Sequence, residues 1–128
     1  MRPSRQHLGL LAATWVLAFT PRLAHAADCE SAIRFAAVVA DQGRRALTSE
    51  NFVEVRRIAN EARWPAIDAA RQARACGCAD AAPPLADAAL TATRADNALN
   101  LLAAQQFALR ITAQGEAAGE ALRRCNAR

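Results

Sequence analysis

The chain has 128 residues and carries 16 basic side chains, all of them arginine, against 12 carboxylates, which gives a net charge of +4. It has four cysteines, no lysine and no tyrosine, and both of its histidines precede residue 27. Residues 27–128 therefore offer no histidine for a Ser-His-Asp triad or for a zinc ligand. A chain of this length predicts one small domain.

The first 26 residues have the pattern of a secretory signal peptide. Arg2 and Arg5 precede an apolar run over residues 8–19, and Ala24 and Ala26 form a small-x-small cleavage site. The run is shorter than the roughly 20 residues that a membrane-spanning helix needs. We therefore expect cleavage after Ala26, a periplasmic or secreted mature chain, and no integral membrane anchor in that form. The mature chain has 13 arginines against 12 carboxylates, so we expect no nucleic-acid partner.

A first helix is predicted from its N-cap residue, Asp28, to about Leu47. One broad face of this helix is apolar and the opposite face is charged. The apolar face holds Cys29, Ile33, Phe35, Ala36, Val39, Ala40 and Leu47. We expect this face to point into the core.

A second helix is predicted over residues 50–75, with Thr48 and Ser49 as its cap. Its apolar residues recur every three or four positions and are mostly methyl groups: Phe52, Val55, Ala59, Ala62, Ala66, Ala69, Ala73 and Cys76. Such small side chains predict tight antiparallel packing on the first helix and no roomy ligand cavity between them. The opposite face carries charges at the same spacing, typical of exposed ion pairs: Glu54, Arg57, Glu61, Asp68 and Arg71.

A third helical region is predicted from a turn ending at Pro83 and Pro84 to about Arg124. As one straight helix it would be about 60 Å long, too long for so small a domain, so we expect a break at residues 97–100 or at residues 112–115. Residues 97–109 carry no charge. We favour a buried central helix for this segment over an uncharged partner surface.

Four cysteines in an exported chain predict a disulfide framework. A helical hairpin places Cys29 near Cys76 and Cys78, so we expect Cys29 to pair with one of these two and Cys125 to pair with the other. An alternative is that Cys76-Gly77-Cys78 is itself a thiol-redox or Cu(I)-handling site.

Trp64 has two possible environments. On an ideal helix it points away from the apolar side of the second helix. We favour burial of Trp64 against the third helical region, the usual location of a large aromatic side chain. If Trp64 is exposed instead, it is a candidate interface anchor together with Arg57, Glu61 and Arg71. Pro65 complicates both interpretations, because it removes a backbone donor and predicts a kink.

The sequence thus predicts an all-α fold, in which residues 27–128 form one antiparallel bundle of three or four helices stapled by disulfides. The expected function is non-enzymatic binding of a protein partner in the cell envelope, as in an envelope-stress, inhibitor or immunity-like factor. No cofactor is expected. The alternative function is thiol exchange or Cu(I) handling at Cys76 and Cys78.

Overall fold

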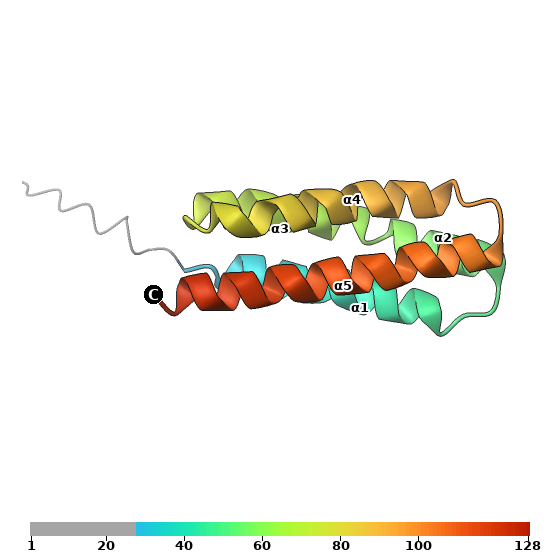
Figure 1. The fold of residues 1–128 in the computed structure, drawn as a ribbon, viewed down its shortest axis with the longest axis horizontal. Helices are drawn as coiled ribbons and strands as arrows, with labels where there is room; N and C mark the ends of the chain where they lie inside the picture. The colour runs from blue at the N-terminus through green and yellow to red at the C-terminus, as the bar shows by residue number, and fades with distance from the viewer. Residues whose placement is uncertain (1–27) are drawn as a thin grey trace, which may run out of the picture.

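A computed structural model describes residues 28–128, which form an all-α fold. The predicted signal peptide lies outside the described residues. Four helical rods pack lengthwise, and consecutive rods run in opposite directions (Figure 1). The first rod is α1 (Glu30–Leu47), and the second consists of α2 (Phe52–Asn60) and α3 (Arg63–Ala75). The third rod is α4 (Ala82–Asp96) and the fourth is α5 (Leu101–Asn126).

The rods form a ring of neighbours. α1 packs against α5 and α3, and α4 packs against α5 and α3. Within residues 28–128 no helix is long and apolar enough to span a membrane.

An aspartate or asparagine side chain accepts a hydrogen bond from a backbone N–H in the first turn of each of the first two helices. The Asp28 carboxylate accepts a hydrogen bond of 2.9 Å from the backbone N–H of Glu30, although the N-cap position itself is Cys29. α2 begins at Asn51, whose side-chain oxygen accepts from the N–H of Glu54 at 3.1 Å. The prediction that Thr48 and Ser49 cap this helix was wrong, because the chain stays irregular until Asn51.

The second rod is broken, whereas the sequence predicted a kinked but continuous helix. α2 ends at Asn60, and α3 begins at Arg63. Pro65 lies in the first turn of α3, where its missing N–H costs no hydrogen bond, because the first N–H groups of a helix have no intrahelical acceptor. Pro65 is therefore better accommodated by a new helix start than by a helix interior.

The predicted break in the third region occurs at residues 97–100. The Asn100 side chain caps α5 by accepting from the N–H of Ala103 at 2.8 Å. The other candidate, residues 112–115, lies inside the continuous helix α5. A Cβ on Gly115 would lie 2.6 Å from the backbone nitrogen of Ala40, so this glycine permits a close crossing of α5 over α1.

The core is built mainly from alanine. The predicted apolar side of the second rod is confirmed: Val55, Ala59, Ala62, Ala66, Ala69, Ala73 and Cys76 are buried, and Phe52 is half-buried. Larger buried side chains come from the other rods, and they include Val39, Leu85, Ile111 and Leu122. On α1, Ala36, Val39 and Ala40 are buried as expected, whereas Ile33 and Phe35 are half-buried.

The four cysteines gather at one end of the bundle as two pairs at disulfide distance. Cys29 pairs with Cys76, with 5.3 Å between the Cα atoms, and Cys78 pairs with Cys125, with 6.0 Å between them. This is one of the two pairings that the sequence allowed. Paired cysteines are consistent with an oxidising compartment.

Gly77 separates the two pairs and ends α3. Its φ is +83°, a left-handed conformation that favours glycine. The N–H of Cys78 donates to the carbonyl of Ala73 at 2.8 Å, and the N–H of Gly77 donates to that of Arg74 at 3.2 Å. These two bonds define a Schellman motif, a common way to close a helix C-terminus. The Cys-Gly-Cys spacing is thus explained by helix termination.

Candidate binding surface

Trp64 lies on the solvent side of α3, with 64% of its surface exposed. The favoured prediction, burial against the third helical region, was wrong. That region divides into α4 and α5, and α3 has α1 on one side and α4 on the other, which leaves the Trp64 face open. The Arg63 guanidinium lies 5.2 Å from the centre of the Trp64 ring, in cation–π contact.

Arg57 and Glu61, two of the residues predicted beside Trp64, form an ion pair at the end of α2. Arg57 Nη1 lies 2.6 Å from Glu61 Oε1, and Arg57 also pairs with Glu54. The hydrogen bond from Arg57 lowers the pKa of Glu54, and the Glu54 carboxylate raises the pKa of Arg57. These charges are mutually satisfied and exposed, as the sequence predicted for this face.

Arg71, the fourth predicted residue, lies on α3 beyond the helix break. Its ion pair is with Asp68, at 3.7 Å. The structure therefore separates the predicted surface into two groups: the ion-paired end of α2, and α3 with Trp64 and Arg71.

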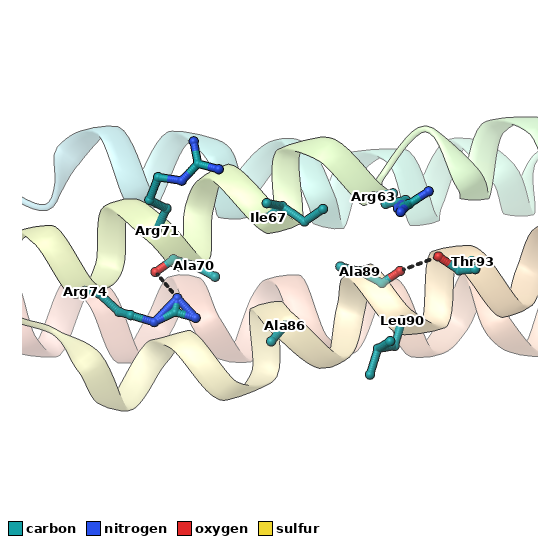
Figure 2. Close-up of a pocket in the computed structure, with 9 residues that line it drawn as sticks. All are labelled: Arg63, Ile67, Ala70, Arg71, Arg74, Ala86, Ala89, Leu90 and Thr93. Carbon is teal, nitrogen blue, oxygen red and sulfur yellow. Dashed lines mark hydrogen bonds between the residues drawn. The ribbon is translucent and has the colours of Figure 1, made fainter.

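A groove between α3 and α4 has Arg63, the residue in contact with Trp64, in its lining (Figure 2). Its volume is about 550 Å³. Its apolar lining comes from both helices, and arginines from α3 stand around it. The lining residues are Arg63, Ile67, Ala70, Arg71, Arg74, Ala86, Ala89, Leu90 and Thr93.

The groove is electropositive, because three arginines and no carboxylate belong to its lining. Arg74 reaches into the groove, where its Nη1 donates to the carbonyl of Ala70 at 3.4 Å (Figure 2). Within residues 28–128, neither Arg63 nor Arg74 has a carboxylate within 4.0 Å. On the other rods, Arg34 and Arg124 have carboxylate partners at 3.1 and 2.9 Å, whereas Arg45, Arg94 and Arg110 have none within 4.0 Å among residues 28–128. The positive charge of the groove is thus largely unneutralised.

The uncharged segment over residues 97–109 is only partly buried. Ala104 and Ala108 are in the core, but Leu99, Leu102 and Leu109 are 91%, 65% and 57% exposed. The prediction of a buried central helix was wrong for these leucines: Leu99 lies in the turn before α5, and α5, as one of four rods in a ring, has one face toward solvent. Asn100, in the same segment, serves as the cap of α5.

The cysteine cluster is the other chemically distinctive site. The Sγ atoms of Cys29, Cys76 and Cys78 lie within 4.8 Å of one another, and those of Cys29 and Cys78 are 3.1 Å apart although they are not paired. Metal ions bind cysteine as a thiolate, and a sulfur in a disulfide is not a thiolate. In this state the cluster does not provide thiolate ligands.

The sequence did not indicate the groove, because it depends on which helix lies beside α3. One signal was present: Arg63, Ile67, Arg71 and Arg74 recur at helical spacing, on a different face from the alanines of the core. Comparison of the chain with protein-family models, curated proteins and solved structures finds no match.

Proposed function

We propose that this protein is an exported, non-enzymatic binding protein that engages a protein partner in the cell envelope through the exposed side of α3. The observation that carries the proposal is Trp64, which is 64% exposed and has the Arg63 guanidinium against its ring. Tryptophan and arginine are the residues most enriched among those that dominate binding energy at interfaces. A large apolar side chain held in water gains most when a partner covers it.

The proposed periplasmic or secreted location rests on the signal-like first 26 residues and on the cysteine pairs. Disulfides persist in oxidising compartments, and small exported domains use them to supplement a limited core. Here the core is mostly alanine, which buries little apolar area per residue. Two covalent staples at one end would offset that weakness.

A binding role is favoured over catalysis by the state of the chain's reactive groups. The four cysteines are paired, and no histidine follows residue 25. Glu54 has a lowered pKa, caused first by its hydrogen bond from Arg57, whereas a general acid needs a raised one. These features support a surface that recognises a partner.

Thiol–disulfide exchange at Cys76-Gly77-Cys78 is the second candidate, favoured by the 3.1 Å between the Sγ atoms of Cys29 and Cys78, which belong to different pairs. An external dithiol that reduced the Cys78–Cys125 pair would itself be oxidised to a disulfide, and the Cys78 thiolate would attack the Cys29 sulfur, forming a Cys29–Cys78 bond and releasing the Cys76 thiolate. Mass spectrometry of the unreduced, proteolysed protein tests this idea. Two long-range pairs that survive mild reductant would eliminate it.

The binding proposal is tested with Trp64→Ala and a matched control, Leu109→Ala, whose side chain is similarly exposed on another rod. Both variants should melt within a few degrees of the wild type, because neither side chain is in the core. Only Trp64→Ala should lose the partner captured from envelope extracts by immobilised protein. Equal capture by both variants would contradict the proposal.

A further inference from the structure

The groove between α3 and α4 combines two properties that suit one class of small ligand. Its apolar lining consists of Ala70, Ala86, Ala89, Ile67 and Leu90 (Figure 2). Its charged lining is entirely cationic. A molecule with an apolar chain and one anionic head matches both properties at once.

We propose that this groove binds a free, single-chain anionic amphiphile such as a fatty acid. The inference goes beyond the proposed function, because it adds a small ligand in the groove next to the surface proposed for a protein partner. The carboxylate lies against Arg74, with Arg71 about one turn away, and the chain extends along Ile67 and Leu90 toward Arg63. Guanidinium forks bind carboxylates with two parallel hydrogen bonds, which fixes the orientation of the head.

The size of the groove suits one small molecule. A volume of about 550 Å³ falls within the range of roughly 300–1,000 Å³ that is typical of small-molecule sites. From Arg63 to Arg74 the helix advances about 16 Å, the length of one extended chain of about a dozen carbons. The alanines of the lining keep the groove open, because a longer side chain at Ala70, Ala86 or Ala89 would occupy part of its volume.

The electrostatics select the sign of the head group. Arg74 has no carboxylate within 4.0 Å among residues 28–128, and the pair between Arg71 and Asp68 is long, at 3.7 Å. An incoming carboxylate can therefore bind these guanidinium groups without breaking a close ion pair. A cationic head on the same chain would be repelled by the three arginines of the lining.

The test is calorimetric titration of the exported protein, purified with its cysteines paired, with dodecanoate below its micelle concentration. Two probes separate head from chain: dodecyltrimethylammonium has the same chain with a cationic head, and acetate has the same head without the chain. Dodecanoate should bind once per chain and at least tenfold more tightly than either probe. No saturable binding of dodecanoate, or equal binding of the cationic probe, would overturn the inference.

Matched variants locate the site. Arg74→Gln should weaken dodecanoate at least tenfold, whereas Arg34→Gln, at an exposed arginine of α1, should leave it unchanged. Leu90→Ser should weaken binding several-fold, whereas Leu109→Ser should not; these leucines are 58% and 57% exposed, so neither change should unfold the protein. Equal effects within either pair would place the ligand elsewhere and refute the proposal.

Two further binding experiments distinguish the proposed ligand from other occupants of the groove. Vesicles containing anionic phospholipid that bind the protein, when monomeric dodecanoate does not, would replace the proposal with a membrane-surface site. An acidic amphipathic peptide that binds in place of dodecanoate would replace it with a peptide groove. If dodecanoate fails while Trp64→Ala still abolishes partner capture, the ligand class is wrong and the proposed function stands.

Discussion

The close crossing of α1 and α5 predicts that alanine substitutions at two glycines of α5 change the stability of the fold in opposite directions. Gly115 and Gly119 are both buried in α5. A Cβ on Gly115 would lie 2.6 Å from the backbone nitrogen of Ala40 and 3.0 Å from its Cα and Cβ. A Cβ on Gly119 would meet nothing closer than 3.4 Å, where the neighbour is the mobile end of Arg123.

Two opposing free-energy terms decide the outcome at each position. Replacing glycine by alanine inside a helix stabilises it by about 1 kcal/mol through helix propensity. Overpacking a core typically costs about 1–3 kcal/mol, and the upper part of that range applies at Gly115, because a backbone nitrogen cannot rotate away. Gly115→Ala should therefore destabilise by about 1–2 kcal/mol, whereas Gly119→Ala should stabilise by about 0.5–1 kcal/mol.

Thermal unfolding followed by circular dichroism measures both changes. For a domain of about 100 residues, 1 kcal/mol shifts Tm by roughly 4–8 °C. Tm should fall by about 5–10 °C in Gly115→Ala and rise by a few degrees in Gly119→Ala. If Gly115→Ala raised Tm as much as Gly119→Ala does, the close crossing of α1 and α5 would be refuted.

Three further predictions concern the ends of the helices and the exposed ion pairs. Gly77→Ala should lower the free energy of unfolding by about 1–2 kcal/mol, because alanine is strained at φ +83° although nothing lies within 4 Å of its Cβ. Denaturant unfolding measures this change, and an unchanged midpoint would contradict the Schellman motif at Gly77. Replacing Cys29 and Cys76 together by serine opens a loop with a separation of 47 residues, and in the chain-entropy model this lowers the free energy of unfolding by about 4 kcal/mol. The same denaturant assay measures the loss, and a loss below about 1 kcal/mol would show that the pair does not stabilise the fold as a disulfide. The lowered pKa of Glu54 means that its pairing with Arg57 stabilises the fold above the ordinary glutamate pKa and is lost as pH falls through the lowered value. Tm measured against pH should therefore show Glu54→Gln slightly below the wild type at pH 7 and equal to it in strong acid, whereas a constant gap would contradict the pairing.

The periodicity of the sequence predicted much of the fold because burial in a helix repeats every three or four residues. The alanines from Ala59 to Ala73 are buried where that spacing placed them. The cysteine pairs followed from the same reasoning, since a helical hairpin returns the end of α3 to the start of α1. The choice between two pairings did not follow, because Cys76 and Cys78 are only two residues apart.

Features that depend on which rods are neighbours could not be predicted from the periodicity of one helix. Gly115 looked like a break, since glycine weakens an isolated helix, but it permits the approach of α1. Trp64 was expected to be buried against the third helical region, the usual location of a large aromatic side chain. In the ring of four rods that face is open, and the groove beside it arises only from the pairing of α3 with α4.

The central claim is that the protein functions through the exposed side of α3, and photocrosslinking in living cells tests it most directly. A photoreactive phenylalanine analogue is placed at position 64 in one variant and at position 109 in the other, and the adducts are identified by mass spectrometry. We predict a discrete protein adduct at position 64 that is absent at position 109. No adduct at position 64, or the same adducts at both positions, would contradict the claim.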